Sequence, residues 1–82
     1  MQTNAIRATL LQYKGRCASV NARDSEFYGW IVIDVEPLKE PERSISVIEE
    51  VTEEILVLNY FDAKEMQYIP LDKIITVKVI LR

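Results

Sequence analysis

The sequence of 82 residues contains no histidine, one cysteine, two glycines and three prolines. Without histidine there is no imidazole to activate a nucleophile or to bind a metal, and one cysteine cannot build a zinc cage. The two isolated glycines, Gly15 and Gly29, cannot form a glycine-rich loop around a phosphate. We therefore expect no catalytic residues, no cofactor and no metal site, and the protein is not expected to be an enzyme.

Long apolar runs are also missing from the sequence. No run approaches the roughly 20 residues that a helix needs to cross a bilayer, and the first residues lack the basic-then-apolar pattern of a signal peptide. The single cysteine, Cys17, cannot form an internal disulfide and fits a reducing compartment, where it would pack as a small apolar residue. These absences predict a cytoplasmic protein without a membrane partner.

Apolar residues are abundant for so short a chain. They make up 49% of the sequence, against 28% charged residues, and the length suits a single domain over residues 1–82. A domain of this size buries only about 60% of the surface that its unfolded chain exposes. Some apolar surface is therefore expected to remain for a partner, and a second copy of the chain is the first candidate.

Charge is unevenly distributed along the chain, although the net charge is only −3. Residues 1–23 contain four bases and no acid, whereas residues 24–82 contain 13 acids and six bases. Such asymmetry predicts one basic face on the folded protein. Chance placement of surface charge is the alternative interpretation.

Residues 3–13 predict a short helix. Ile6, Leu10 and Tyr13 fall on one helical face, and Gly15 follows as a stop signal. The same segment also alternates as a strand would, which leaves a strand as the alternative.

The next segments have β character. Residues 16–22 alternate small apolar and polar side chains, which predicts a half-buried strand, after which a polar turn is expected at residues 23–26. Residues 27–35 are apolar on both faces, so both faces should be covered. A charged loop with two prolines is predicted at residues 36–43.

The segment 44–61, SISVIEEVTEEILVLNYF, is ambiguous. Ser46 and Glu49 could form a helical capping box, but the many β-branched residues favour one long bent strand with a polar middle. Two further strands are predicted at residues 65–70 and 75–81. In the second of these, one inward row is expected, formed by Ile75, Val77, Val79 and Leu81.

A helix followed by about five bent strands with short turns is typical of a small SH3-like or Sm-like barrel, so the predicted fold class is a mainly-β, five-stranded barrel with an N-terminal helix. The layout resembles the Sm/LSm family, which includes the bacterial RNA chaperone Hfq. The first motif is matched by Gly15, Arg23 to Ser25, Phe27, Gly29, Ile31 and Asp34. The second is matched more loosely by MQYIPLDKIITVKV, residues 66–79, in which Tyr68 alone corresponds to a residue of the family's RNA-contact motif.

The resemblance implies a ring of roughly five to seven copies, in which the fourth strand of one subunit pairs with the fifth strand of the next. The residues that would form this subunit interface are Met66, Gln67, Tyr68, Ile69, Pro70, Ile75, Thr76, Val77, Lys78 and Val79. The alternative is a monomeric barrel whose edges are blunted by Lys64, Lys78 and Pro70.

The resemblance also implies binding to RNA or another single-stranded nucleic acid. Candidate phosphate contacts are Arg7, Lys14, Arg16, Arg23, Lys39, Arg43 and Lys73, and candidates for base stacking are Tyr60 and Tyr68. The alternative function is a homo-oligomeric protein-interaction or assembly module without RNA binding, which would use the acidic surface or the Tyr28 and Trp30 face. A metal-dependent enzyme built on residues 49–54 is disfavoured, because adjacent acids on a strand point to opposite faces.

Overall fold

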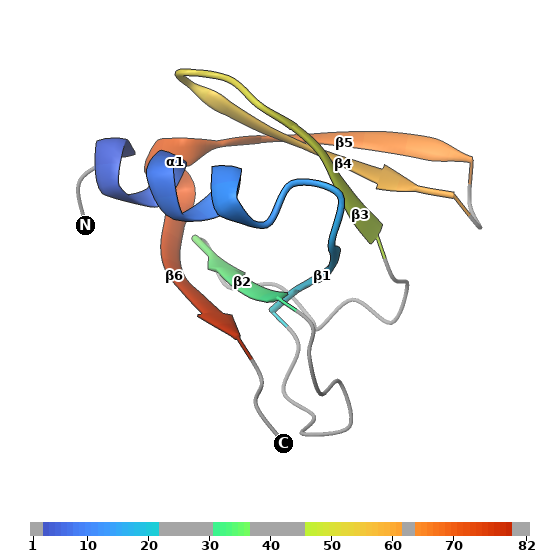
Figure 1. Ribbon diagram of the computed structural model, residues 1–82, viewed down its shortest axis with the longest axis horizontal. Helices are drawn as coiled ribbons and strands as arrows, with labels where there is room; N and C mark the ends of the chain where they lie inside the picture. Colours follow the sequence, from blue (N-terminus) through green and yellow to red (C-terminus); the bar gives the residue numbers. More distant parts are fainter. Residues whose placement is uncertain (1–2, 22–30, 37–45, 62–63, 80–82) are drawn as a thin grey trace.

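The computed structural model describes residues 3–21, 31–36, 46–61 and 64–79. This part of the chain forms one helix, six strands and one 3-10 turn (Figure 1). The elements are α1 (Thr3–Gln12), β1 (Cys17–Val20), β2 (Ile31–Val35), β3 (Ser46–Val51), β4 (Ile55–Tyr60), β5 (Glu65–Pro70), η1 (Leu71–Lys73) and β6 (Ile74–Val79). The predicted mainly-β fold with an N-terminal helix is confirmed, but six strands replace the expected five. The predicted loop at residues 36–43 lies outside the described residues except for Glu36, which is exposed.

All six strands belong to one sheet in the order β5-β4-β3-β1-β2-β6. Every neighbouring pair is antiparallel except β1 and β2, which run parallel, with Ala18 opposite Ile31 and Val20 opposite Ile33. Parallel strands need a crossover connection rather than a tight turn. The polar turn predicted at residues 23–26 lies outside the described residues.

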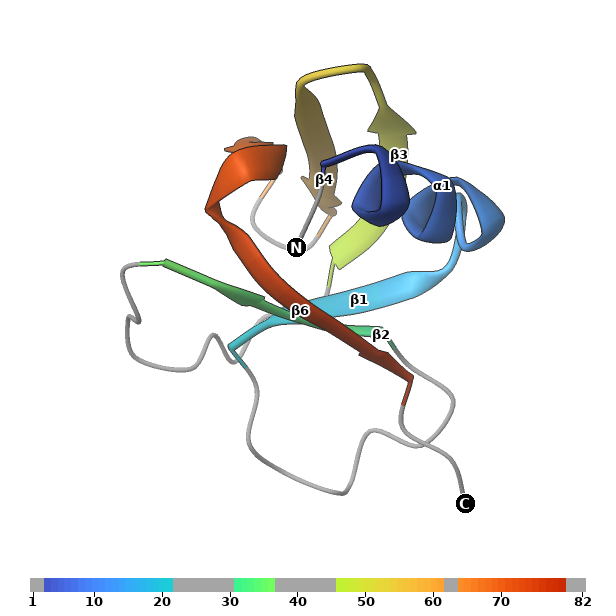
Figure 2. The ribbon, with the colours of Figure 1, turned by 90° about the vertical axis from the view of Figure 1, so that its left-hand side faces the viewer.

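The sheet is strongly curled. β5 and β6 are its two edge strands, yet only the three residues of η1 join them. In a flat sheet, five spacings of about 4.8 Å would place the edges roughly 24 Å apart, whereas the chain from Pro70 to Ile74 reaches at most about 14 Å. The corner at η1 therefore brings one end of each edge together, and β3, β4 and β5 lie across from β1, β2 and β6 (Figures 1 and 2). The described parts of β5 and β6 are not paired with each other.

The prediction of one long bent strand after residue 46 is wrong, because this segment forms the β3–β4 hairpin. At its turn the N–H of Thr52 donates to the carbonyl of Ile55 at 2.9 Å. The Thr52 hydroxyl oxygen accepts from the N–H groups of Glu54 at 3.3 Å and Ile55 at 3.0 Å. One side chain thus satisfies two backbone donors, which turns the polar middle of the segment into a tight reversal.

A β-bulge explains how two consecutive acids fit into β3. Ile48 pairs with Leu58 and Glu50 pairs with Val57, so Glu49 is an extra residue on its strand. An extra residue resets the alternation of side chains. Both glutamates are therefore exposed, while Ile48 remains buried in the core.

A second bulge corrects the predicted inward row of β6. The register shifts opposite Asp34 and Val35, and Ile75 is the extra residue. Ile75 consequently points outward and is 42% exposed, whereas Val77 and Val79 pack against the core. The prediction is wrong at Ile75 because the bulge interrupts the two-residue period. Leu81 lies outside the described residues.

The predicted face of the helix is confirmed. Ile6 and Leu10 are buried inside the curl of the sheet and Tyr13 packs against the same cluster. Gly15, with a positive φ of 86°, ends this segment, and its N–H donates to the carbonyl of Ile48 at 2.8 Å. The sheet side chains of this core are Ala18, Val20, Ile31, Ile33, Val35, Ile48, Val51, Leu56, Leu58, Tyr60, Ile69 and Ile74, with Leu71 from η1.

The predicted half-buried character of the first strand is wrong, because its polar side chains are buried too. Ser19 lies opposite Val32 in the parallel pair, and both are buried. Asn21 is also buried, adopts a φ of 56°, and its Oδ1 accepts the N–H of Val35 at 2.9 Å. In the described part of β2, both faces are therefore covered, as expected; Phe27, Tyr28 and Trp30 lie outside the described residues.

Candidate functional site

The edges of the sheet carry most of the exposed large apolar side chains. Met66 and Tyr68 on β5 are 41% and 63% exposed, and Ile75 on β6 is 42% exposed. Phe61, which follows β4 directly, is 51% exposed, and the remaining exposed large apolar side chain among the described residues is Leu11 on α1. The segments predicted to form a subunit interface therefore lie at the two sheet edges, with apolar side chains open to solvent.

The hydrogen-bond ladder shows which backbone groups of β5 face away from the sheet. The N–H of Leu71 donates to the carbonyl of Glu54 at 2.8 Å, in register with the β4–β5 pairs. Along an antiparallel ladder, hydrogen-bonded pairs alternate with non-hydrogen-bonded pairs. Ile69, two residues before Leu71, therefore also bonds to β4 through its backbone. Met66 and Tyr68 consequently direct their N–H and C=O groups outward. Pro70 belongs to this outward set and has no N–H, which suits an edge strand.

The same reasoning orients the backbone of β6. The N–H of Glu36 donates to the carbonyl of Lys73 at 2.8 Å, and the carbonyl of Ile33 accepts from the N–H of Asn21 on the β1 side. The backbone groups of successive β2 residues therefore hydrogen-bond to β1 and to β6 in turn. The β2 residues that bond to β6 are paired with its even-numbered residues, Thr76 and Lys78. The odd-numbered residues Val77 and Val79 direct their backbone groups outward.

Polar side chains beside the β6 edge already contact one another. The Thr76 hydroxyl donates to Oδ2 of Asp34 at 2.7 Å, and Nζ of Lys78 lies 3.2 Å from the same oxygen. The Lys78 side chain is still 53% exposed, while that of Asp34 is 24% exposed. This group of three fixes Lys78 at the edge without burying its ammonium.

The basic residues near the N-terminus face the acidic β3–β4 hairpin. Nζ of Lys14 lies 3.3 Å from Oε2 of Glu50, and Nε of Arg7 donates to the carbonyl of Thr52 at 3.2 Å. The backbone N–H of Val51 and the Lys14 ammonium lower the pKa of Glu50 below its ordinary value. The predicted excess of positive charge is therefore partly neutralised within the fold.

The other candidate RNA contacts lie in different places. The Arg16 guanidinium stacks over the ring of Tyr13, 5.8 Å from its centroid. Tyr60 is 3% exposed and its hydroxyl donates to Oε1 of Gln67 at 2.7 Å, so its ring packs in the core and offers no face to a base. Tyr68 and Lys73 are exposed. The remaining candidates, Arg23, Lys39 and Arg43, lie outside the described residues.

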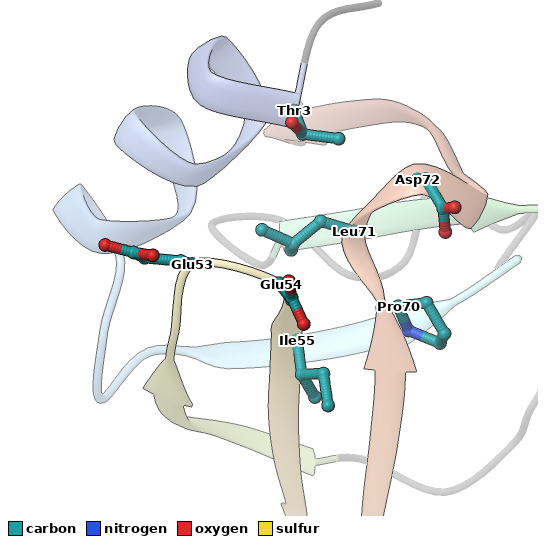
Figure 3. A pocket seen from close by; sticks show the side chains of 7 residues that line it. All are labelled: Thr3, Glu53, Glu54, Ile55, Pro70, Leu71 and Asp72. Atoms are coloured by element: carbon teal, nitrogen blue, oxygen red, sulfur yellow. The ribbon is translucent and has the colours of Figure 1, made fainter.

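A hollow of about 390 Å³ lies where α1, the β3–β4 turn and the β5–η1 corner meet (Figure 3). Its lining consists of Thr3, Glu53, Glu54, Ile55, Pro70, Leu71 and Asp72. The three carboxylates point in different directions (Figure 3), and nowhere in the described residues do three or more Cys, Asp or Glu side chains form a group that could hold a metal ion. Sequence reasoning missed this hollow because its lining comes from three separate segments.

No helix within the described ranges is long and apolar enough to cross a membrane. Comparisons of the chain with protein-family models, with curated proteins and with solved structures found no match. The function therefore has to be inferred from the chemistry of the two sheet edges and of the surface beside them.

Proposed function

We propose that the protein is a homo-oligomeric assembly module of the Sm-like kind, in which β5 of one copy pairs with β6 of the next. The observation that carries this proposal is that both strands are edges of one sheet, with Met66, Tyr68 and Ile75 exposed on them. An uncovered edge presents a row of free N–H and C=O groups, which readily accepts another strand.

The two edges favour a ring over a symmetric pair. β5 and β6 are different surfaces of one chain, so their contact is head-to-tail, and a head-to-tail contact repeats into a ring where the rotation between copies closes and into an open filament where it does not. Each added copy would cover one β5 edge and one β6 edge, and a closed ring would leave neither uncovered. The apolar content of 49% in a chain that can bury only about 60% of its unfolded surface supports the same arrangement.

Light scattering on the purified protein over a dilution series tests this proposal. A ring of roughly five to seven copies of the 9.5 kDa chain has a mass of about 48 to 67 kDa, and this mass should persist over a range of concentrations before dilution separates the copies. A particle that remains at 9.5 kDa even at high protein concentration would refute the proposal.

RNA binding is the second candidate function, and the open aromatic side chains of the β4–β5 hairpin favour it. Phe61 is 51% exposed and Tyr68 is 63% exposed. Stacking of a base on such a ring contributes roughly 1 to 3 kcal/mol. Lys64 and Lys73 are also exposed and could contact phosphates. In a ring, where the neighbouring copy would cover Tyr68, the groups Phe61, Lys64 and Lys73 would still be repeated once per copy, which offsets the small number of cations on each chain.

Binding of fluorescent oligo-A and oligo-U at low and at moderate salt tests the second candidate. If the β4–β5 hairpin binds RNA, the affinity should be measurable at low salt and should fall steeply as the salt concentration rises. The Phe61→Ala variant should bind more weakly than the parent protein. Phe61 lies outside β5, so this variant should keep the native mass of the parent protein. Absence of binding even at low salt would exclude RNA and leave the assembly proposal intact.

A further inference from the structure

We propose that the two edges join in one defined antiparallel register, in which Met66 of one copy lies opposite Val77 of the next. This inference rests on the proposed assembly function and adds the residue pairs that specify it. It follows from two independent properties of the edges, namely the direction of their backbone groups and the chemistry of their side chains.

The backbone restricts the pairing first. Met66 and Tyr68 direct their N–H and C=O groups out of β5, and Val77 and Val79 do so from β6, as the internal ladders require. A hydrogen-bonded pair forms only where outward groups on both strands face each other. Met66 can therefore lie opposite Val77, or opposite an outward residue two positions away, whereas a slip of one residue would turn the bonding groups away from each other.

The side chains then select among these registers. With Met66 opposite Val77, these two apolar side chains lie on one face of the joined sheet together with Tyr68, whereas Ile75, displaced by the β6 bulge, points to the other face. In the same register Glu65 lies opposite Lys78 and Gln67 lies opposite Thr76. Charges of opposite sign, polar side chains and apolar side chains are thus matched at successive positions, which is the pattern that stabilises neighbouring strands.

The competing registers match less well. A slip of two residues in one direction places Tyr68 opposite Lys73, and a slip in the other direction places Ile69 opposite Thr76. A two-fold pairing of β5 with itself, centred on Gln67, places Glu65 opposite Ile69. None of these alternatives brings Glu65 opposite Lys78, the pair of opposite charges that distinguishes the proposed register.

Lys78 is placed to form the intermolecular ion pair. Its Nζ lies 3.2 Å from Oδ2 of Asp34 within the same chain, and its side chain is 53% exposed. An ammonium has three donors, so Lys78 can keep Asp34 and also accept Glu65 of the next copy as a partner. Glu65 is exposed at the start of β5.

Disulfide trapping tests the register directly. In a Cys17→Ala background, cysteines replace Gln67 and Thr76, which would form a non-hydrogen-bonded pair with Cα atoms about 4.5 Å apart, within disulfide range. Mild oxidation should then produce a ladder of linked multimers on a non-reducing gel. The matched control carries cysteines at Gln67 and Val77, which point to opposite sides of the joined sheet, and should remain unlinked.

Several outcomes would overturn the register while the assembly itself stands. Linkage of Gln67→Cys alone would show β5 paired with itself, and stronger linkage of cysteines at residues 67 and 74, or 67 and 78, would show a slip of two residues. Charge reversal gives a second measure: Glu65→Lys should raise the dissociation constant severalfold, and adding Lys78→Glu should lower it again but not to the parent value, because a glutamate at residue 78 would lie beside Asp34. A protein that stays solitary in light scattering would instead refute the assembly, and the register with it.

Discussion

Replacement of Tyr68 by lysine should separate the copies while leaving each copy folded. The Tyr68 side chain is 63% exposed at the β5 edge and is not part of the core cluster. Its loss should therefore cost the isolated fold little, since exposed positions usually change stability by about 0.5 kcal/mol or less. A lysine on an edge strand, in contrast, places a hydrated charge where the next strand would have to dock.

The structure sets the size of the effect. A tyrosine buries roughly 150 to 250 Å², so the 63% that is exposed on Tyr68 corresponds to roughly 95 to 160 Å². At about 25 cal/mol per Å², full coverage of this area by a neighbour would contribute about 2.4 to 4 kcal/mol, which corresponds to roughly two to three orders of magnitude in the dissociation constant. The neighbouring strand would cover only part of the ring, so we expect an increase of at least about tenfold.

Sedimentation velocity over a dilution series measures the dissociation constant, and urea unfolding measures the stability of the folded chain. Leu11→Lys is the matched control, because Leu11 is 39% exposed on α1 and the substitution adds the same charge outside both edge strands. Equal dissociation constants for the Tyr68→Lys variant, the control and the parent would refute the assignment of β5 to the interface. Loss of folding in Tyr68→Lys alone would contradict its position outside the core.

Three further predictions concern the fold that presents these edges, and urea unfolding checks each of them. Leu10→Ala should lower the free energy of unfolding by about 2 to 5 kcal/mol because it empties a fully buried site, while Leu11→Ala should change it by about 0.5 kcal/mol or less; equal losses would contradict the orientation of α1. The N–H of Val51 lowers the pKa of Glu50 below 4.5, so the ionised carboxylate contributes stability above the unfolded pKa, and this contribution disappears as the pH falls through the lower folded pKa. Glu50→Gln should therefore be less stable than the parent at neutral pH and equal to it in strong acid, and a difference that persists in acid would contradict this cause. Because Asn21 has a φ of 56°, Asn21→Gly should be more stable than Asn21→Ala by about 1 to 2 kcal/mol, whereas equal stabilities would show that backbone strain is not the deciding factor.

Local patterns in the sequence were sufficient to predict the helix and the two edge strands, but not the β3–β4 hairpin. The spacing of Ile6, Leu10 and Tyr13 predicted the buried face of the helix, because that spacing depends only on helical geometry. The β-prone runs at residues 65–70 and 75–81 predicted strands, and the structure places the described parts of both segments at sheet edges. Pro70 pointed to an edge position, since a proline cannot donate within a central ladder.

The irregular features depend on contacts between distant segments, which no local pattern contains. Glu49 and Ile75 are bulged residues, and each bulge is set by the register of the neighbouring strand rather than by its own sequence. The alternation in residues 16–22 predicted an exposed polar face, but Ser19 is buried opposite Val32 on the parallel neighbour. A period of two residues tells which side chains share a face and not what covers that face.

Charge was the least predictable property of the candidate site. The four bases of residues 1–23 suggested a free basic face, and the acids of residues 49–54 suggested a separate acidic surface. Folding sets the two segments against each other, with Lys14 beside Glu50 and Arg7 on the carbonyl of Thr52. Because Lys14 and Arg7 already have partners within the fold, they could contribute less to the affinity for RNA phosphates.

The curl of the sheet leaves the outer surfaces of the two edge strands exposed to solvent. Both edge strands meet at η1, and α1 occupies the inside of the curl with Ile6 and Leu10, so the helix covers the core and leaves the outer surfaces of β5 and β6 to solvent. Covering those surfaces from within would require another layer of chain, which a domain of 82 residues with one ten-residue helix does not provide in its described part. A neighbouring copy would provide that layer with its own edge strand. The outward backbone groups of that strand recur every second residue, as those of β5 and β6 do, so the two edges can form hydrogen bonds with each other. The size of the domain and the direction of its edge groups are thus two independent arguments for the proposed partner, a second copy of this chain.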